Sequence, residues 1–412
     1  MTLSPFAAVH IQHCHNARAQ IGGRWPLELN EVLPGEQIEQ ALAEIASWPG
    51  YSPTPLHELT PLAHELGIAQ VFYKDESFRF GLESFKALGG AYAVARLLEQ
   101  QISARTGQRV TARSIRSGQH AAAAREITVA TATDGNHGRS VAWGAQTFGC
   151  PCKIYIHAEV SEGRKRAMET FGAEIVRIKG NYDASVRQAA ADAEDNGWFI
   201  VSDTSYEGYT DLPRLVMAGY AVMVDEILDV TGADAPFTHV FVQGGVGGLA
   251  AALCARLWQR LGESRPRFVI VEPDRAPCLY RSAVNGEPTA VTVTEETIMA
   301  GLSCGEVSEL AWKILYPGAN DFLTLPDDAI GPTMRGLGAC EYGSIPVVGG
   351  ESGVAGLAAL IAITTQGTMT APLELSGDSR VLVLGTEGAT DPEIYTRLTG
   401  MAPSSIRGSH QS

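Results

Sequence analysis

Residues 126–138 read EITVATATDGNHG: an apolar run rich in β-branched residues ends in a glycine-containing turn, which leads into an Ala-rich helical pattern. A strand, a turn and a helix in this order form the repeating unit of parallel sheets that are covered by helices. The pattern continues along the chain, with strands expected at 152–157, 173–178 and 198–202 and helices at 161–172 and 183–196. This stretch therefore predicts a compact α/β arrangement around a parallel sheet.

A second sheet is expected further along the chain. The apolar run THVFVQ at 238–243 leads into a glycine-rich segment and a helix to about Leu261, and RFVIVE at 267–272 follows as a strand. The last strong strand pattern is RVLVL at 380–384. Because 412 residues exceed the size of one ordinary core, we expect two domains. The predicted parts are a large discontinuous domain of residues 1–91 and 213–402, a small α/β domain of residues 92–212, and a mobile tail from 403 to 412.

The composition is that of a globular protein, with 45% apolar and 19% charged residues. A net charge of -15 and the absence of clustered lysine and arginine argue against a nucleic-acid partner. No run of about 18 uncharged apolar residues occurs, and the N-terminus lacks the segments of a secretory leader, so we expect a cytoplasmic protein with no membrane partner. The cysteines predict no disulfide framework, and no metal site is predicted, since Cys150 and Cys152 are too close together for a zinc knuckle.

Lys86 ends the segment YKDESFRFGLESFK at 73–86 and opens a helical pattern of small residues at 87–95. A cation at the start of a helix is opposed by the helix dipole. Lys86 is therefore either a surface residue whose ammonium reaches solvent or an amine whose surroundings keep it reactive. The segment alone leaves both interpretations open.

The turn TDGNHG at 133–138 lies between the first strand and its helix. Backbone N–H groups point outward at such a position and bind anions such as a carboxylate, and glycines let a ligand approach the backbone closely. An Asx turn that caps the helix explains the same residues. Taken by itself, the turn does not decide between ligand binding and capping.

The segment QGGVGGLA at 243–250 offers several N–H donors at the start of a helix, with glycines that allow phosphate oxygens to reach them. Gly245, Gly247 and Ala250 also fit the fingerprint of dinucleotide-binding enzymes. Glu272 follows at the end of the next strand, where that fingerprint places an acidic residue. The segment predicts a phosphate site in either case, and a nicotinamide oxidoreductase remains an alternative.

Taken together, the segments resemble the fold type II pyridoxal-phosphate enzymes, the group that includes tryptophan synthase β, threonine dehydratase and serine racemase. Their order along the chain carries the resemblance: SFK at 84–86 comes first, DGNHG at 134–138 second, the glycine loop at 244–248 third and GTEG at 385–388 last. The similarity covers nearly the whole chain. It implies an α/β fold of two open, mostly parallel sheets covered by helices, with pyridoxal 5'-phosphate as the cofactor.

The resemblance also assigns roles around the cofactor. It implies an imine between the cofactor and Lys86, a position for Asn136 facing the ring oxygen, and a position for Thr386 beside the pyridine nitrogen. A neutral hydroxyl beside that nitrogen cannot protonate the ring strongly, which favours elimination over transamination. The remaining cofactor contacts are expected from Phe85 and, around the phosphate, from Gly244, Gly245, Val246, Gly247 and Gly248.

Within this group the chain resembles the diaminopropionate ammonia-lyases at 75–82, 133–139, 203–209 and 386–392. The resemblance implies α,β-elimination of D- and L-2,3-diaminopropionate, a small amino acid, to pyruvate and two molecules of ammonia. A lyase or dehydratase for another 3-substituted alanine, such as serine, threonine or hydroxyaspartate, would keep the same motifs. A protein that binds the cofactor without catalysis would not need a carboxylate at Asp134.

Asp134 departs from the serine that most relatives carry before the Gly-Asn-His triplet. In related racemases this position is the acid-base group on the cofactor face opposite the lysine, so Asp134 is expected to take the α-proton of the D-isomer and Lys86 that of the L-isomer. Asp203 resembles a second family carboxylate that would hold the distal ammonium of the substrate, although an Asp that caps a loop explains it as well. The expected substrate contacts are Thr133, Asp134, Asn136, His137 and Asp203.

Cys278 and Cys304 resemble a cysteine pair of the family. The resemblance implies a disulfide that would steady a loop near the site entrance, whereas a reducing cytoplasm favours two thiols. It also implies a homodimer, and the other expected partner is the small amino-acid substrate.

Overall fold

The computed structural model describes residues 1–20, 22–133, 135–234 and 236–407, and the chain packs into two compact units. Each unit combines segments that are distant in the sequence. Unit 1 comprises Met1–Gly35, Ser52–Ser84 and Met223–Ser412, and unit 2 comprises Glu36–Tyr51 and Phe85–Val222.

The boundaries between the units lie elsewhere than the sequence analysis placed them. Residues 85–91 and 213–222 belong to unit 2, where Leu88 and Gly219 pack directly against each other. A Cβ atom on Gly219 would lie 2.2 Å from the carbonyl oxygen of Leu88, so only glycine allows this approach. Residues 36–51 also pack within unit 2. Contacts between distant segments therefore set the boundaries, and local sequence patterns do not report such contacts.

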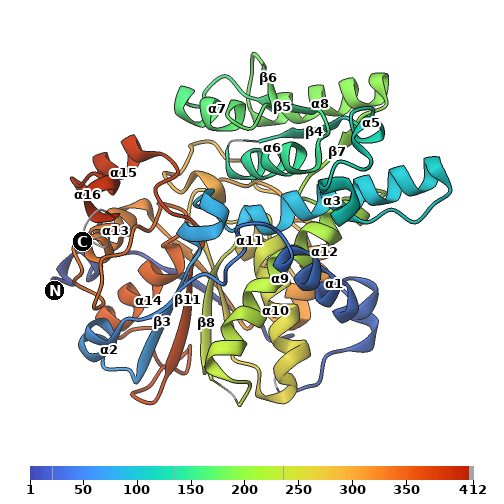
Figure 1. Cartoon of the computed structure of the whole chain (residues 1–412). Helices are drawn as coiled ribbons and strands as arrows, with labels where there is room; N and C mark the ends of the chain where they lie inside the picture. The colour runs from blue at the N-terminus through green and yellow to red at the C-terminus, as the bar shows by residue number, and fades with distance from the viewer. Residues whose placement is uncertain (21, 134, 235, 408–412) are drawn as a thin grey trace. The chain divides into compact units, whose positions relative to one another are not determined.

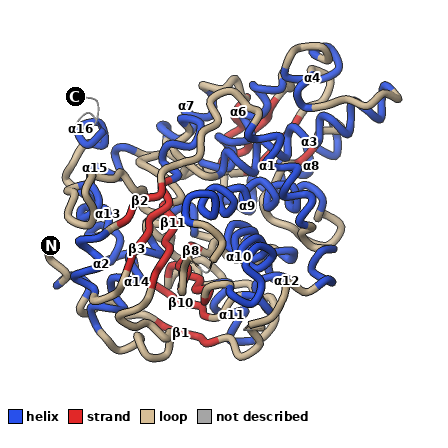
Figure 2. The backbone as a smooth tube through the Cα atoms, turned by 60° about the horizontal axis from the view of Figure 1, so that its bottom comes forward, coloured by secondary structure: helices blue, strands red, loops and turns tan. Residues whose placement is uncertain are grey.

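Unit 1 is built on a sheet of seven described strands, in which the central strands run parallel. These strands are β1 (Gln12–His15), β2 (Leu56–Glu58), β3 (Gln70–Asp75), β8 (His239–Gln243), β9 (Arg267–Pro273), β10 (Asp321–Leu325) and β11 (Arg380–Gly385). Their order is β1-β10-β9-β8-β11-β3-β2, and the edge strands β1 and β2 are antiparallel to their neighbours. Figure 2 shows these strands side by side in red, with β1 and β2 at the two edges. The carboxyl ends of the parallel strands share one edge of the sheet, which is where such sheets bind ligands.

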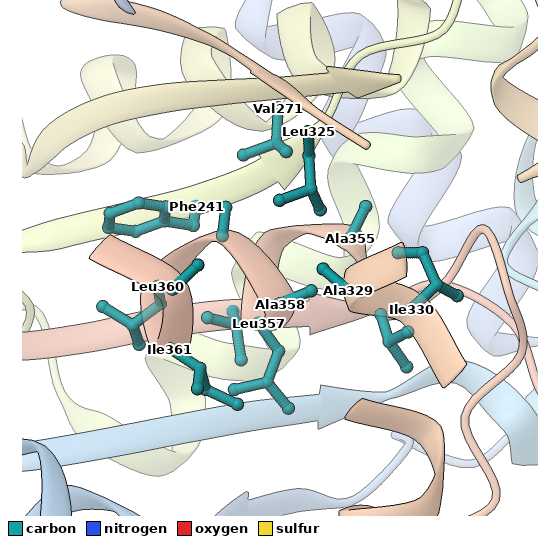
Figure 3. Packing of buried hydrophobic residues seen from close by; sticks show 14 of the residues in the cluster. Phe241, Val271, Leu325, Ala329, Ile330, Ala355, Leu357, Ala358, Leu360 and Ile361 are labelled. Atoms are coloured by element: carbon teal, nitrogen blue, oxygen red, sulfur yellow. The ribbon is translucent and has the colours of Figure 1, made fainter. Parts of the chain in front are cut away.

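The helices of unit 1 pack on this sheet and on one another. They are α2 (Thr60–Leu66), α10 (Gly248–Leu261), α11 (Cys278–Asn285), α12 (Glu309–Gly318), α13 (Ile330–Gly338), α14 (Ala355–Gln366), α15 (Pro392–Thr399) and α16 (Pro403–Arg407). Figure 3 shows Leu357, Ala358 and Leu360 of α14 in the same apolar cluster as Phe241 of β8. All four side chains are fully buried. Because each large apolar side chain stabilises the fold by about 1.5–3 kcal/mol on burial, this layer fixes the strands that carry the glycine loop.

Unit 2 contains a parallel sheet of four described strands in the order β6-β5-β4-β7. Its strands are β4 (Val129–Ala132), β5 (Cys152–Ile156), β6 (Glu174–Arg177) and β7 (Phe199–Ile200). Its helices are α1 (Gly35–Ala46), α3 (Lys86–Thr106), α4 (Ala112–Arg116), α5 (Ala121–Ala124), α6 (Asn136–Phe148), α7 (Glu162–Glu169) and α8 (Tyr182–Asn196), followed by α9 (Asp211–Thr231), which ends in unit 1. α6 and α8 both pack on β4 and β5 (Figure 1).

The strands and helices that the sequence predicts between 126 and 202 are all present in unit 2, with ends that differ by a few residues. The strands β1, β2, β3 and β10 complete the sheet of unit 1 and were not predicted from the sequence. Residues 403–407 were expected in a mobile tail but form α16, and 408–412 lie outside the described residues. No helix formed by the described residues has the length and apolar character that a membrane crossing requires.

A network of buried charges joins three segments of unit 1. Nε of Arg79 donates to Glu76 at 2.8 Å, and its Nη1 donates to Glu226 at 2.8 Å. Nζ of Lys74 donates to Glu226 at 2.7 Å and to the carbonyl oxygen of Thr54 at 2.8 Å. Although burial alone would raise it, the Arg79 guanidinium and the Lys74 ammonium hold the pKa of Glu226 below its ordinary value. Two cations balance two carboxylates, so the network is neutral. Its hydrogen bonds fix residues 74–79, which precede Lys86 in the chain.

The Glu226→Gln variant is expected to lose about 3–5 kcal/mol of stability, because it leaves Lys74 and Arg79 buried with one carboxylate between them. Calorimetry should show the thermal midpoint fall by roughly 10 °C. Glu263→Gln is a matched control, since the Glu263 side chain is 67% exposed and lies 3.9 Å from Arg24. The control should change stability by less than about 0.5 kcal/mol. Equal midpoints for the two variants would contradict the role given to the network.

Candidate active site

Lys86 is the first residue of α3, and its ammonium lies among groups that attract a cation. Nζ donates a hydrogen bond to the carboxylate of Asp203. It also lies 5.3 Å from the centroid of the Phe85 ring and 5.7 Å from that of Tyr220. The Lys86 side chain is only 20% exposed. The structure therefore does not support the interpretation of Lys86 as a surface residue whose ammonium reaches solvent.

Close packing of helices within unit 2 fixes the start of α3. The hydroxyl of Ser140 in α6 donates to the carbonyl oxygen of Lys86 at 2.6 Å and accepts from the N–H of Ala91 at 3.2 Å. A Cβ atom on Gly90 would lie 2.4 Å from that hydroxyl, so the glycine allows the two helices to approach. The backbone of Lys86 is thus held by a side chain from the helix that begins at Asn136.

His137 lies in the first turn of α6 and is buried, with 7% of its surface exposed. Nε2 is 2.9 Å from the carbonyl oxygen of Val201, and Nδ1 is 3.8 Å from a carboxylate oxygen of Asp203. Burial lowers the pKa of His137, and the Lys86 ammonium lowers it further, while Asp203 opposes the shift. The imidazole is therefore neutral near pH 7. Because a carbonyl oxygen only accepts, the proton is on Nε2 and Nδ1 is an acceptor.

Asp203 lies in the loop that follows β7, and Tyr209 fixes this loop. The Tyr209 hydroxyl donates to the carbonyl oxygen of Ile200 at 2.8 Å and accepts from the N–H of Ser202 at 3.0 Å. Burial alone would raise the pKa of Asp203, but the Lys86 ammonium lowers it well below its ordinary value. Asp203 is therefore ionised at neutral pH and is available to bind a cation.

The turn at 133–138 contributes further residues next to α6. The hydroxyl oxygen of Thr133 accepts from the N–H groups of Gly135 and Gly138, both at 3.1 Å, so Thr133 organises the turn from within. A Cβ atom on Gly138 would lie 2.2 Å from the Thr133 methyl group, which explains the glycine. Asn136 begins α6, and Asp134 lies outside the described residues. The structure therefore brings Lys86, His137 and Asp203 together, with Thr133 and Asn136 in the adjoining turn.

The glycine loop at 244–248 lies in unit 1, between β8 and α10. Gly245 and Gly247 have φ angles of 61° and 96°, which glycine adopts without strain. The N–H groups of Gly244 and Gly247 donate to backbone oxygens. Within the described ranges, no acceptor receives the N–H groups of Gly245, Val246 or Gly248, and no side chain caps α10. Backbone donors without acceptors at a helix start are suited to binding an anion such as a phosphate group.

Thr386 follows β11, the strand next to β8, so it lies at the same edge of the sheet as the glycine loop. Its hydroxyl is buried, and Nε2 of Gln243 lies 3.5 Å from it. The same amide nitrogen donates to the carbonyl oxygen of Leu384 at 2.7 Å. Gln243 thus connects the start of the glycine loop to the end of β11. A neutral hydroxyl at this edge of the sheet is compatible with pyridoxal phosphate, and its expected place beside the pyridine nitrogen stays a prediction.

Glu272 decides against a dinucleotide at this loop. Its carboxylate accepts from the N–H groups of Leu279 at 2.9 Å and Tyr280 at 2.6 Å, so it caps the start of α11. The side chain is 1% exposed, and a Cβ atom on Gly244 would lie 2.7 Å from its Cγ. The dinucleotide fingerprint requires an acidic side chain that accepts a hydrogen bond from a ribose hydroxyl. The Glu272 carboxylate is buried and already accepts from the backbone of α11, so it does not meet this requirement.

Comparison with known proteins agrees with this geometry. A family model described as pyridoxal-phosphate dependent enzyme matches residues 47–387. The chain is 40% identical over 351 residues to diaminopropionate ammonia-lyase of Escherichia coli (strain K12), with 84% of this chain and 87% of that protein covered. The chain belongs to the diaminopropionate ammonia-lyases, within the pyridoxal-phosphate dependent enzymes.

Two solved structures of diaminopropionate ammonia-lyase from Escherichia coli are similar to this member of the family. They are the complex with the aminoacrylate-PLP azomethine reaction intermediate, with a TM-score of 0.83, and the complex with D-serine, with a TM-score of 0.84. Each is 36% identical and covers 95% of this chain and 97% of its own. The predicted fold type II is confirmed, since diaminopropionate ammonia-lyases share it over nearly the whole chain.

The cysteine pair of this ammonia-lyase lies near the glycine loop. Sγ of Cys278 is 3.5 Å from the carbonyl oxygen of Gly245 and donates to it as a thiol. Sγ of Cys304 would be 3.9 Å from a Cβ atom on Gly245. The part of the chain that the structure describes contains no disulfide. Burial raises the pKa of the Cys278 thiol, and the Glu272 carboxylate raises it further, so this thiol stays protonated.

Several residues that shape the site of this ammonia-lyase were missed by the sequence analysis. Tyr220 supplies a ring to the Lys86 ammonium, Ser140 holds the Lys86 backbone, and Val201 fixes the proton on His137. None belongs to a motif, and each acts on a residue that is distant in the sequence. The one local signal that could have indicated them is the pair of glycines after Leu88, since glycine inside a helical pattern is typical of close packing.

The Glu272→Gln variant is expected to flatten the pH dependence of stability. Burial raises the pKa of Glu272 to about 8, so the folded protein binds this proton more tightly than the unfolded chain, whose carboxyl has its ordinary, lower pKa. The resulting stabilisation is complete at acidic pH and is lost as the pH rises to about 8. Glutamine keeps an acceptor oxygen for α11 and does not titrate. Between pH 5.5 and pH 9, the thermal midpoint of the wild type should fall by about 5 °C or more beyond any fall in the variant. The same pH dependence of the midpoint in both proteins would contradict the raised pKa of Glu272.

Proposed function

We propose that this protein catalyses the pyridoxal-phosphate dependent α,β-elimination of D- and L-2,3-diaminopropionate, with pyruvate and two molecules of ammonia as products. The observation that carries the proposal is the contact between the Lys86 ammonium and the ionised Asp203 carboxylate. It places an amine next to an anion that can hold the second ammonium of a diamino acid. The similarity to the Escherichia coli enzyme, whose name states this substrate, supports the same choice.

The cofactor would be held by the residues of the motifs that carry the family resemblance. Nζ of Lys86 would bind it covalently, with Phe85 and Asn136 beside its ring. The loop at 244–248 would bind its phosphate through free backbone N–H groups, and the Thr386 hydroxyl would face its pyridine nitrogen. When bound, the cofactor supplies an electron sink for the charge that develops at the α-carbon.

The protein would contribute the proton transfers and the substrate contacts. The amine of Lys86 removes the α-proton of the L-isomer, and the carboxylate of Asp134 removes that of the D-isomer from the opposite face. Asp203 binds the β-ammonium as an ion pair. Thr133, Asn136 and His137 complete the substrate contacts.

The proposal includes a homodimer in the cytoplasm, an assembly that the resemblance to fold type II enzymes implies. Light scattering during size-exclusion chromatography measures the molar mass directly. A mass of twice that of the chain would support the dimer, and the mass of a single chain would exclude it.

The stoichiometry of the products tests the proposed reaction. Purified holoenzyme is incubated with D- or L-2,3-diaminopropionate, and pyruvate and ammonia are quantified at completion. Two molecules of ammonia for each pyruvate are expected, since the α-amine and the β-amine are both released. Serine would give one ammonia for each pyruvate. Absence of pyruvate from both isomers of the diamino acid would refute the proposed function.

The Asp134→Asn variant is expected to separate the two enantiomers. Asparagine has nearly the volume of aspartate and part of its hydrogen-bonding capacity but no basicity, so the D-isomer rate should fall by roughly 100-fold or more. The L-isomer should lose less, because Lys86 still acts on the other face. Initial rates of pyruvate formation from each isomer measure the difference. Equal losses for both isomers would remove Asp134 as the base for the D-isomer.

A further inference from the structure

Four groups of unit 2 surround the Lys86 ammonium, and each attracts a cation or accepts a hydrogen bond. The Asp203 carboxylate contacts Nζ directly, and the Phe85 and Tyr220 rings have centroids 5.3 and 5.7 Å from it. Nδ1 of His137 lies 3.8 Å from the same Asp203 oxygen. A carboxylate, two aromatic rings and an acceptor nitrogen together form surroundings suited to a primary ammonium.

His137 is held in the state that accepts hydrogen bonds at Nδ1. Its Nε2 lies 2.9 Å from the carbonyl oxygen of Val201, which has no proton to donate, so Nε2 carries the proton. In the described part of the chain, no group donates a hydrogen bond to the buried Nδ1. A buried acceptor without a donor is unfavourable, and a ligand with an N–H group relieves this cost. Nδ1 therefore points to a ligand that donates.

We propose that Nδ1 of His137 accepts a hydrogen bond from the β-ammonium that Asp203 binds, and so completes a subsite that is selective for an ammonium as the leaving group on the β-carbon. This inference rests on the proposed function and names the groups that choose its substrate. A β-ammonium has N–H donors for both the Asp203 carboxylate and Nδ1 of His137. The Lys86 ammonium already shows that a primary ammonium fits against Asp203.

The protonation states of the two residues favour ammonia over water as the group that leaves. When the Cβ–N bond breaks, its electron pair moves to nitrogen, so an ammonium departs as neutral ammonia and takes no proton from the protein. When a Cβ–O bond breaks, a hydroxyl needs one proton to leave as water. An ammonium beside Asp203 lowers the pKa of its carboxyl group, so Asp203 stays ionised when it faces the β-ammonium, and the unprotonated Nδ1 of His137 has no proton to give either. The subsite therefore fits diaminopropionate better than serine.

Two substitutions of His137 separate its acceptor from its bond to Val201. His137→Gln can keep an N–H near the position of Nε2 and has no acceptor at the position of Nδ1. His137→Asn places an amide oxygen near the position of Nδ1 but does not reach Val201. Each holoenzyme is assayed with 2,3-diaminopropionate and with 3-chloroalanine, whose chloride leaves without donating a hydrogen bond. Cofactor absorption and thermal melting report whether each variant folds and binds the cofactor.

For His137→Gln, kcat/KM for 2,3-diaminopropionate should fall by about 10- to 100-fold, which is the usual effect of losing a hydrogen bond to a charged group. The value for 3-chloroalanine should fall much less. His137→Asn should keep more activity toward the diamino acid than His137→Gln. Nitrogen chemical shifts of the wild-type imidazole should also show the proton on Nε2, which is a readout independent of turnover.

Equal losses for both substrates in His137→Gln would show a structural role only and would overturn the inference, as would no loss at all. A wild-type enzyme that uses 3-chloroalanine but not 2,3-diaminopropionate would overturn the proposed function together with the subsite. The wild-type assay alone therefore tests the proposed function, and the variants test the subsite. If neither variant folds, methylammonium is used as a probe of the wild type. It should inhibit turnover of 3-chloroalanine competitively, and absence of inhibition would overturn the subsite.

Discussion

Replacement of Lys86 by alanine is expected to remove the visible absorption of the bound cofactor and to reduce pyruvate formation by about 10⁴-fold or more, since the variant loses both the covalent attachment and one base. The structure supports this site because the Lys86 ammonium is largely shielded from water and paired with Asp203. Absorption spectra and initial rates of the purified variant give the two measurements.

Lys153→Ala is a matched control for this substitution. Nζ of Lys153 also pairs with a carboxylate, at 2.6 Å from Glu174, and lies 5.2 Å from the centroid of the Trp198 ring. The control should keep the absorption and the activity of the wild type. An unchanged spectrum in the Lys86→Ala variant would show that the cofactor is attached elsewhere.

Replacement of Asp203 by asparagine is expected to lower kcat/KM for 2,3-diaminopropionate by roughly 100-fold or more, because the neutral amide no longer pairs with the β-ammonium. The loss should depend on the leaving group, so 3-chloroalanine should be affected less. Asp211→Asn is the control, since the Asp211 side chain is 91% exposed and its only role in the described structure is a surface pair with Arg214. A loss of less than about threefold in the Asp203→Asn variant would exclude Asp203 as the ammonium site.

Local patterns in the sequence predict much of the fold. The alternation from 126 to 202 predicts β4 to β7 and their helices, because each strand lies in an apolar run of the sequence that alternates with turns and helical patterns. The edge strands β1 and β2 contain few apolar residues, and β1 pairs with β10, which is distant in the chain. Their own residues carry little signal, so the sequence analysis did not find them.

The candidate site was predicted as a set of residues but not as an arrangement. The contact between Lys86 and Asp203 joins residues 117 positions apart, and no local pattern links them. The proton on Nε2 of His137 depends on the carbonyl oxygen of Val201, which any residue at that position would supply. The alternative based on Glu272 was likewise open in the sequence, because the fingerprint does not report which groups a carboxylate binds.

The central claim is that this site eliminates ammonia from a diamino acid, and the most direct test is a comparison of kcat/KM for 2,3-diaminopropionate, serine and threonine with the same holoenzyme. The account predicts that the diamino acid is preferred by about 100-fold or more, the discrimination expected when a site pairs an ionised carboxylate with an ammonium. A higher kcat/KM for serine or threonine would contradict it and would identify the protein as a dehydratase with the same fold.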